Sequence, residues 1–423
     1  MIPVPPVARR PHLAVFDLVT SVGGVQQVMA LLLPRLAARF EVSVLDPYRN
    51  PDYARLLAGR GLAPVVLGGA PRRRFVGGAG RAGRALALAR RSPWLLATGL
   101  RLRAWAAARR PDVVWFNQLP SASLFPSFLP AAGPAIVYQA HGFGSAAEIR
   151  SGPRLGRRCA RVVAVSGAVA RLLGDAGVDP ARIAVVPNGV DAEEVVRRAR
   201  APVTPLPPRA PGQVVLVHPA VLGPHKRQHV AIEALARLPP EAVLWLCGST
   251  APGADPAYEA GLRALAARLG VAERVVFLGW RPDLPAVLAA ADVAVLPSRM
   301  ESFGLVLAEA MALGKPCVGA SVGGIPEVIA HAVTGLVAAG EPAAFAAALA
   351  PLVRSAEVRR VMGEAGRRRA RERFGADRQA RAVGDLLGEV IAGGVRAAPA
   401  GATANTTATE PGPGAPASPS TPA

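Results

Sequence analysis

Two glutamates, Glu301 and Glu309, lie eight positions apart in the glycine-containing segment ESFGLVLAEAMALGKP. The residues before it, DVAVLPS (292–298), have the pattern of a buried strand, and a helical pattern runs from about Phe303 to Leu313. Glu301 is therefore predicted to lie in the loop before this helix, and Glu309 to project about two turns into it. The two carboxylates could accept hydrogen bonds at separate places on one ligand.

The predicted start of this helix is suited to binding an anion. Ser302 or a neighbouring residue can cap the helix, and the N–H groups of Phe303, Gly304 and Leu305 would point outward from its positive end. Gly304 has no side chain to block an approaching ligand. A phosphate bound there would leave one carboxylate on each side, and each could accept hydrogen bonds from paired hydroxyls, which sugars offer. These residue types therefore indicate a nucleotide sugar as the ligand.

The strands that must position these residues recur along the chain. The apolar run HLAVFDLV (12–19), the glycines Gly23 and Gly24, a helical segment and the strand pattern EVSVLD form a β-α-β unit, which predicts a parallel sheet. The strand patterns DVVWFN, AIVYQAHG, RVVAVS and IAVVPNGVD continue the sheet. In open parallel sheets the carboxyl ends of the strands face the ligand crevice. Residues 1–200 are predicted to form this first domain.

A second domain follows a proline-rich linker. The segment RAPVTPLPPRAPGQ (200–213) lacks periodicity, which places a linker at 201–212. Strand and helix patterns then alternate again over 213–370 and predict a second doubly wound domain that contains the glutamate pair. An amphipathic helix is predicted over 371–393. The remainder, 394–423, is rich in Pro, Ala and Thr and is predicted to be disordered.

Composition limits the class of protein. A chain of 423 residues with 51% hydrophobic residues is long enough for two α/β cores. The net charge of +20 comes almost wholly from Arg, because Lys226 and Lys315 are the only lysines, so it reflects compositional bias as much as a basic surface. Cys159, Cys247 and Cys317 are far apart and indicate neither a disulfide framework nor a zinc site. Since no signal-peptide pattern and no apolar stretch of about 18 residues occurs, we expect a cytoplasmic protein.

In the order of its motifs the chain resembles the retaining glycosyltransferases of family 4. Glu301, seven intervening residues and Glu309 match the E-x7-E signature of that family. Six further segments occur in the family order: GGVQQVMALLLPRLAARFEVSVL, HG at 141, VVAVSGAVARLL, VVPNGVD at 185, HKRQHVAIEAL at 225 and VVFLGW at 275. The resemblance covers most of residues 12–392. It implies the GT-B fold, in which two Rossmann-like doubly wound domains face a central cleft and a C-terminal helix crosses back to the first domain.

The resemblance implies a role for each matching residue. Glu301 would contact hydroxyls of the donor sugar, and Glu309 the ribose. Lys226 would neutralise the diphosphate as it leaves, which is the task of a metal in other enzymes, and His141 would lie beside the anomeric centre or the sugar. The remaining residues would border the donor or acceptor, chiefly through backbone groups: Gly23, Gly24, Phe303, Gly304, Leu305, Gly279, Trp280 and Arg281. Neither a metal nor a cofactor is implied.

One position departs from the family pattern. Family members carry an Arg five positions before the lysine that corresponds to Lys226, and this chain has Val221 there. The donor diphosphate would lose a bidentate partner. Arg227 and Arg299 are the candidates to replace it, and the sequence leaves both open. An inactive homologue is therefore an alternative interpretation.

The implied reaction moves a hexosyl unit from a nucleoside-diphosphate sugar to a hydroxyl of a saccharide or lipid-linked acceptor, with retention and without a protein nucleophile. An epimerase of the GT-B fold is the alternative enzyme. A pyridoxal-dependent phosphorylase would need a Schiff-base lysine, and neither lysine has a suitable setting. The positive charge also raises a nucleic-acid-binding protein. Because the chain lacks aromatic stacking runs and helix-turn-helix or RNA motifs, no nucleic-acid partner is expected.

Residues 72–110 are strongly basic, with eleven arginines and no acidic residue. Trp94 and Trp105 lie among the leucines and alanines of this segment. Such a helix could lie on an anionic membrane surface, which would suit a lipid-linked acceptor and a peripheral position on the inner face of the membrane. The alternative is an ordinary Arg-rich helix of the first domain that packs its apolar side inward.

Overall fold

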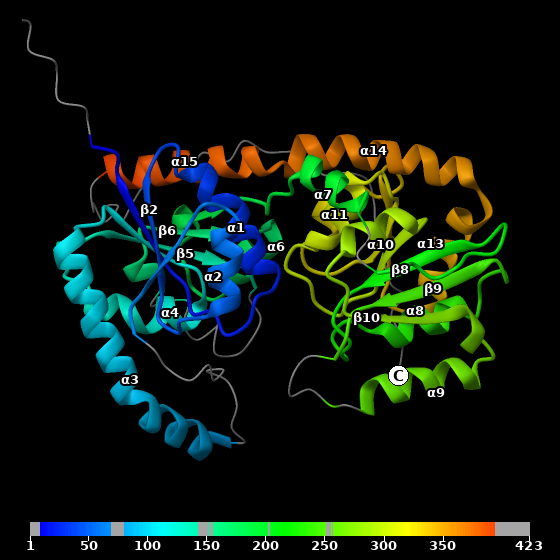
Figure 1. Ribbon diagram of the computed structural model, residues 1–423, viewed down its shortest axis with the longest axis horizontal. Coiled ribbons are helices and arrows are strands. Elements are labelled where there is room, and N and C mark those ends of the chain that lie inside the picture. Colours follow the sequence, from blue (N-terminus) through cyan, green and yellow to red (C-terminus); the bar gives the residue numbers. More distant parts are fainter. Residues whose placement is uncertain are drawn as a thin grey trace, which may run out of the picture.

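The computed structural model describes residues 9–68, 80–142, 152, 155–201, 204–250, 255 and 257–393, with the backbone alone for 80–91. Of the basic segment 72–110, residues 72–79 therefore lie outside the described residues, as does the predicted disordered segment 394–423. The predicted fold class is confirmed: two doubly wound α/β domains lie side by side, and two C-terminal helices run along both of them (Figure 1).

The first sheet has, among the described residues, seven parallel strands in the order β3-β2-β1-β4-β5-β6-β7. Its strands are β1 (His12–Phe16), β2 (Glu41–Asp46), β3 (Pro64–Val66), β4 (Val113–Phe116), β5 (Ala135–Ala140), β6 (Arg161–Ala164) and β7 (Ile183–Val185). Its helices are α1 (Gly24–Leu36), α2 (Pro51–Ala58), α3 (Gly80–Arg109), α4 (Leu119–Leu124), α6 (Gly167–Asp175) and α7 (Ala192–Ala199). Because the strand order reverses between β1 and β4, a ligand crevice is expected at the carboxyl ends of these two strands.

The second sheet has six parallel strands within the described chain, in the order β10-β9-β8-β11-β12-β13. Its strands are β8 (Val214–Pro219), β9 (Ala242–Cys247), β10 (Val275–Gly279), β11 (Val293–Leu296), β12 (Cys317–Ala320) and β13 (Gly335–Ala338). The helices that follow are α8 (Gln228–Leu235), α9 (Ala257–Arg268), α10 (Leu284–Ala290), α11 (Leu305–Ala312), α12 (Ile325–Val328), α13 (Pro342–Arg354), α14 (Ala356–Phe374) and α15 (Ala376–Ala392). The order reverses between β8 and β11, which are the strands before the two predicted site loops.

The chain returns to the first domain through its last two helices (Figure 1). α14 packs against α11 of the second domain, and α15 packs against α1 of the first. The single helix predicted over 371–393 is wrong in this respect, because extended backbone at Gly375 separates α14 from α15. Near the start of α15, Asp377 Oδ1 forms an ion pair with Arg35 Nε of α1 at 2.7 Å.

The chain also meets the second domain before the linker. α7, which precedes the linker predicted at 201–212, packs against α10 and α11. Arg281 then holds the described part of the linker. Its Nε lies 2.7 Å from Asp283 Oδ1, and its guanidinium donates to the carbonyl oxygens of Thr204 at 2.7 Å and Pro205 at 3.1 Å. The arginine is thus fully engaged in joining the linker to the second domain.

The two tryptophans of the basic segment 72–110 pack inward. Trp94 stacks on Tyr48 with ring centroids 5.1 Å apart, and Trp105 meets the ring of His12 edge-on at 5.6 Å. The two tryptophans therefore follow the alternative of a helix that packs its apolar side inward, because both rings fill the space between α3 and the first sheet. In the described residues no helix is both long and apolar enough to cross a membrane.

Candidate active site

Lys226 and Glu301 meet at the carboxyl edge of the second sheet. Lys226 lies in the loop after β8 and Glu301 in the loop after β11, and because these strands are neighbours both loops leave the sheet at the same place. Lys226 Nζ lies 2.6 Å from Glu301 Oε2, and the Ser298 hydroxyl donates to the same oxygen at 3.3 Å. The two charged side chains are only 19% and 18% exposed. The structure thus brings together the two residues that the sequence assigned to one site.

The start of α11 presents unpaired backbone donors beside this ion pair. Gly304 is the N-cap, in the left-handed conformation (φ 92°), so Ser302, the first candidate for a cap, does not cap the helix. The N–H groups of Phe303, Gly304 and Leu305 donate no hydrogen bond to any described residue. The ring of Phe303 packs edge-on against Phe374 at 5.4 Å and so anchors the loop. The helix start therefore retains the donors that an anion would need.

Two glycines allow the Glu301 loop to lie where it does. The Gly324 N–H donates to the carbonyl oxygen of Glu301 at 2.9 Å. At Gly323 (φ 52°) a Cβ atom would lie 1.9 Å from that same oxygen, which no side chain could tolerate. The glycine pair that follows the glutamate motif in the sequence therefore supports the backbone that carries Glu301.

Glu309 lies further along α11 in a pocket where the two domains meet. Gln27 and Leu31 of α1 and Arg198 of α7 line the pocket with it. Burial raises the pKa of the Glu309 carboxyl to about 7, and the charge of Arg198 opposes this effect. No hydrogen bond or ion pair with another described residue occupies the carboxyl. It is therefore available to hydroxyl groups of a ligand.

The raised pKa gives a prediction for donor binding. If ionised Glu309 accepts hydrogen bonds from the ribose hydroxyls, the affinity for UDP-glucose should fall about tenfold between about pH 8 and pH 6, because most of the carboxyl is then protonated. Burial and the charge of Lys226 lower the pKa of the neighbouring His225, which moves its titration towards the acid side of this range. Calorimetric titration against pH measures the effect. The affinity of Glu309→Gln for UDP-glucose should not change with pH over this range. If the affinity of the variant falls with pH as steeply as that of the wild type, the assignment is contradicted.

The first domain contributes two glycines to the same cleft. A Cβ atom on Gly24 would lie 3.8 Å from Leu305 Cδ2, so the turn before α1 lies against the start of α11. A Cβ atom on Gly142 would lie 3.3 Å from Ser302 Oγ, which places the end of β5 against the loop before α11. His141, the neighbour of Gly142, is thereby brought to the donor motif of the other domain.

His141 is held by a residue that the sequence analysis did not single out. Its Nε2 lies 2.6 Å from Asn117 Oδ1, at the carboxyl end of β4. Burial lowers the pKa of the His141 ring to about 3, so the ring is neutral at physiological pH. The polar end of the strand pattern DVVWFN was the available signal, since strand ends of neighbouring parallel strands meet.

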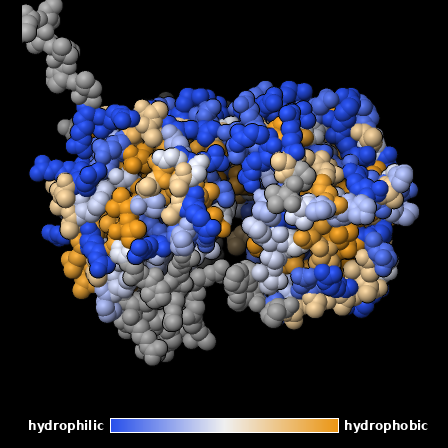
Figure 2. All heavy atoms as spheres, viewed as in Figure 1, coloured by the Kyte–Doolittle hydropathy of each residue, from blue (hydrophilic) through white to orange (hydrophobic). Residues whose placement is uncertain are grey.

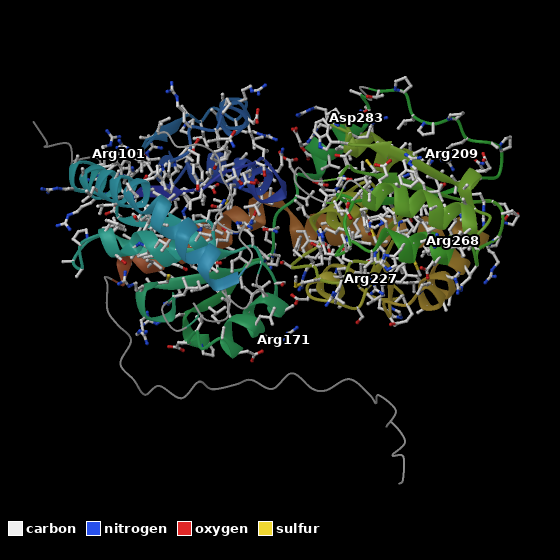
Figure 3. All side chains as sticks on the ribbon, turned by 90° about the horizontal axis from the view of Figure 1, so that it is seen from below. Arg101, Arg171, Arg209, Arg227, Arg268 and Asp283 are labelled. Atoms are coloured by element: carbon white, nitrogen blue, oxygen red, sulfur yellow. The ribbon has the colours of Figure 1, made fainter. Side chains whose placement is uncertain are left out.

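Side chains also join the two domains directly, and a furrow between the domains is visible in Figure 2. The carboxylate of Glu327 accepts hydrogen bonds at 2.7 Å from each of the first two N–H groups of α6, and the Ser166 hydroxyl donates to the carbonyl oxygen of Ser302 at 2.7 Å. Figure 3 shows Arg171 of α6 on the side of the first domain that faces the second. Sequence reasoning missed these residues, because only the packing of the domains shows that they meet.

The missing arginine of the family pattern is not replaced by Arg227. The Arg227 guanidinium turns to the end of β13, where its Nη1 would lie 2.4 Å from a Cβ atom on Gly340, and Figure 3 labels the residue. Val221 itself is 46% exposed. The Arg299 N–H donates to the carbonyl oxygen of His225 at 2.9 Å, so the exposed Arg299 belongs to a loop that lies against the lysine loop. The structure thus places the Arg227 side chain at the end of β13 and the backbone of Arg299 beside the lysine loop.

The other predicted donor-binding residues have clear places. Gly23 is the N-cap of α1, and its N–H donates to Gln26 Oε1 at 3.1 Å. Gly279 (φ 64°) ends β10, where its carbonyl oxygen accepts from the Gly248 N–H at 2.8 Å, and Trp280 after it is 70% exposed. The side chain of Arg281 is occupied by the linker, so only the backbone of this segment is open to a ligand.

Comparison with known proteins decides the family. A model of glycosyl transferases group 1 matches residues 207–369, and a model of glycosyltransferase family 4 matches residues 22–194. The two matches fall on the two doubly wound domains. The chain belongs to the family 4 glycosyltransferases. This confirms the resemblance drawn from the order of the motifs.

Curated relatives of this family 4 chain match part of it. D-inositol 3-phosphate glycosyltransferase of Mycobacterium marinum is 38% identical over 180 residues, which are 42% of this chain and 38% of that protein. N-acetyl-alpha-D-glucosaminyl L-malate synthase of Bacillus anthracis is 37% identical over 167 residues, which are 39% of this chain and 42% of that protein. The chain thus spans about two fifths of the length of these relatives.

Solved structures share the fold over almost the whole family 4 chain. HepE of Anabaena in complex with UDP-glucose has a TM-score of 0.73 and 23% identity, over 90% of this chain and all of that one. A glycosyltransferase from Rickettsia africae has a TM-score of 0.70 and 15% identity, over 91% and 99% of the two chains. At these identities the likeness establishes the two-domain architecture alone.

Proposed function

We propose that this protein is a retaining glycosyltransferase that moves a hexosyl unit from a nucleoside-diphosphate sugar to a hydroxyl of a saccharide or lipid-linked acceptor. One observation carries the proposal: the Lys226–Glu301 ion pair, 2.6 Å long, lies beside the unpaired amides at the start of α11. A cation and free N–H groups suit a diphosphate, and the neighbouring carboxylate suits sugar hydroxyls. The Anabaena neighbour, solved with UDP-glucose, supports a nucleotide sugar as the donor class.

Each charged group has a task in this reaction. The cation of Lys226 and the amides at the start of α11 stabilise the negative charge that grows on the diphosphate as the sugar bond breaks. Glu301, whose carboxylate is held by Lys226 and Ser298, orients the sugar through its hydroxyls. Glu309 holds the ribose. The acceptor hydroxyl attacks from the face that the diphosphate leaves, and the departing phosphate oxygen takes its proton.

We propose further that the transfer needs no metal ion. The charge on the diphosphate is met by Lys226 and by the helix start, which together supply the stabilisation that a divalent cation would give. Among the described residues, no three His, Cys, Asp or Glu side chains form a group that could hold a metal. Full activity in excess EDTA is the expected result, and loss of activity that Mg²⁺ or Mn²⁺ restores would contradict it.

The stereochemistry of the product tests the reaction. With UDP-glucose and water as the acceptor, proton NMR should show release of UDP and first appearance of α-glucose, before mutarotation. First appearance of β-glucose would overturn retention. An epimeric nucleotide sugar formed without acceptor would support the epimerase instead. Binding without any release of UDP, with saccharide acceptors present, would favour the inactive homologue.

We also propose a reducing cytoplasmic location with peripheral contact to an anionic membrane through α3. Leu96 and Leu100, one turn apart, are 54% and 52% exposed, and Arg103 follows on the same face. Figure 3 places Arg101 of this helix on the outer side of the first domain, away from the second. Exposed leucines beside arginines, in a chain of net charge +20, fit anionic headgroups.

Vesicle binding tests this contact. The protein should cosediment with vesicles that contain phosphatidylglycerol and not with pure phosphatidylcholine vesicles, and salt should weaken the binding. Changing Leu96 and Leu100 together to Ser should reduce the bound fraction severalfold. Val361→Ser, at a residue of α14 that is 50% exposed, is the matched control and should bind normally. Equal binding to both kinds of vesicle would contradict the proposal.

A further inference from the structure

A chain of polar side chains connects three strand ends of the first domain. Asp17 follows β1, Asn117 and Gln118 follow β4, and His141 follows β5. Asp17 is fully buried; its Oδ2 accepts from Asn117 Nδ2 at 3.1 Å and its Oδ1 from Gln118 Nε2 at 2.6 Å. Asn117 Oδ1 lies 2.6 Å from His141 Nε2. The carboxylate of Asp17 is thus linked to the His141 ring through a single amide.

The direction of these hydrogen bonds fixes the tautomer of the histidine. An ionised carboxylate can only accept, so Asn117 must turn its NH₂ group to Asp17 and its carbonyl oxygen to His141. A carbonyl oxygen also only accepts, so the proton of the neutral ring lies on Nε2. Burial raises the pKa of Asp17 to about 6, which leaves it mostly ionised at neutral pH. The other ring nitrogen, Nδ1, then carries a lone pair and no proton.

His141 lines a pocket that opens beside the donor motif. The pocket, of about 310 Å³, is lined by Asn117, Gln118, Gln139, His141 and parts of α1 and α4. Nδ1 of His141 has no hydrogen-bond partner among the described residues. It is not buried, so a ligand can reach it. Because the next residue, Gly142, lies against the loop before α11, a sugar held at that loop is within reach of the pocket.

The pocket lining suits a neutral hydroxylated group. Its polar side chains, among the described residues, are four carboxamides, the neutral His141 ring and the hydroxyl-bearing Tyr138, and no described Lys, Arg, Asp or Glu lines it. Gln139 is fully buried there, and both its oxygen and its nitrogen lack a hydrogen-bond partner. Carboxamides and an unprotonated ring nitrogen recognise hydroxyls, which both donate and accept, and they offer nothing to balance a formal charge.

We propose that Asn117 is a positioning residue, which holds His141 in its Nε2–H tautomer so that Nδ1 accepts a hydrogen bond from a hydroxyl of the transferred sugar. This assignment rests on the function proposed above. It also excludes one role, because a neutral ring whose Nδ1 lacks a proton cannot give a proton to the leaving diphosphate from that atom. The specificity that follows is for a sugar with a hydroxyl at this position, since a deoxy sugar would leave Nδ1 unpaired.

Nitrogen NMR reads the tautomer directly in the full-length protein. The chain has six histidines, so ¹⁵N-histidine labelling gives few signals, and His141→Gln identifies the one that matters. We expect the His141 signals of an Nε2–H tautomer that does not titrate between about pH 6 and pH 8, because the pKa of the ring is about 3. Asn117→Leu should give a mixture of both tautomers. A wild-type ring with the proton on Nδ1 would overturn the proposal.

Two further variants separate positioning from simple destabilisation. Gln118→Leu removes a carboxamide from the same carboxylate of Asp17 but leaves Asn117 on His141, so the tautomer should not change. Asn117→Asp keeps an oxygen that accepts from the ring, and because its other oxygen would face Asp17 Oδ2, where Nδ2 now lies at 3.1 Å, the two carboxyls should share one proton and the ring should keep its Nε2–H. If Asn117→Leu does not fold, the nitrogen spectra of Gln118→Leu and Asn117→Asp still test the role of Asn117. A mixed tautomer in Gln118→Leu or in Asn117→Asp would contradict the proposal.

Donor affinity completes the test. Asn117→Leu should weaken binding of UDP-glucose about fivefold to tenfold and leave binding of UDP, which has no sugar, unchanged. An equal loss for both ligands would indicate a structural role only and would overturn the assignment. If the wild-type protein binds neither ligand, the proposed function fails, whereas the tautomer experiment, which uses no ligand, still tests the role of Asn117.

Discussion

Replacing Lys226 with methionine is expected to slow the release of UDP from UDP-glucose by about a hundredfold to a thousandfold, the usual cost of removing one preorganised electrostatic group. The cation lies 2.6 Å from Glu301 in a site where both side chains are mostly buried, so water cannot take over its task. A single-turnover assay at saturating donor measures the chemical step. Methionine is unbranched and one atom shorter than lysine, and it removes the charge together with the N–H donors of the ammonium group.

The chain offers a matched control for this change. Lys315 is the only other lysine, and it lies after α11, outside the cleft. Lys315→Met should therefore release UDP at close to the wild-type rate. The Lys226 variant must also remain folded, and its melting temperature without ligand reports this. A folded Lys226→Met protein that keeps a third or more of the wild-type rate would contradict the role given to the lysine.

The two glutamates of the motif should affect different ligands. Glu309→Ala is expected to weaken binding of UDP and UDP-glucose alike, because both carry the ribose. Glu301→Ala should weaken UDP-glucose alone, because UDP lacks the sugar. Hydrogen bonds to a charged group contribute about 1.5–3 kcal/mol, so each loss should lie between about tenfold and a hundredfold. Calorimetric titration of both ligands against each variant gives the four affinities.

The melting temperature of Glu309→Ala without ligand shows whether weaker binding comes from a lost ligand contact or from a destabilised fold. Burial raises the pKa of Glu309 from 4.5 to about 7, so the folded protein binds this proton more tightly than the unfolded chain and loses stability as the pH rises between these values. Removing the carboxyl removes that loss, and the variant without ligand should melt no lower than wild type at pH 8. Glu259→Ala on α9, outside the cleft, is the control for binding. A Glu309 variant that binds UDP normally would contradict the ribose contact.

Much of the fold could be predicted because the strands are short, buried and regularly spaced. HLAVF, after its first residue, and VVWF are apolar throughout, as is typical of strands in a parallel sheet covered on both faces, and the polar residues that follow them mark the cleft. Lys226 and Glu301 meet because each follows a strand of the second sheet, and the carboxyl ends of neighbouring parallel strands lie at the same edge of a sheet. The order of the motifs then indicated the arrangement of the two domains.

The parts that could not be predicted depend on contacts between distant segments. The amphipathic pattern runs on through RERFGADRQA, and only the extended backbone at Gly375 shows that the helix stops there and a second one crosses over. Glu327 is an ordinary helix carboxylate in the sequence, and its contact with the start of α6 arises only when the domains pack. The environment of Trp94 could not be predicted for the same reason. An amphipathic sequence pattern does not show whether a membrane or the rest of the protein covers the apolar face of the helix.

The most direct test of donor binding in this cleft is thermal stabilisation by a panel of UDP-, GDP- and ADP-sugars in EDTA, repeated on Glu309→Ala. A ligand that binds only the folded protein must raise the melting temperature, by an amount that grows with its concentration. We predict that the sugars of one nucleotide class stabilise the wild-type protein without metal and that Glu309→Ala loses this stabilisation. Stabilisation by no donor, or an equal effect on the variant, would contradict donor binding at Glu309.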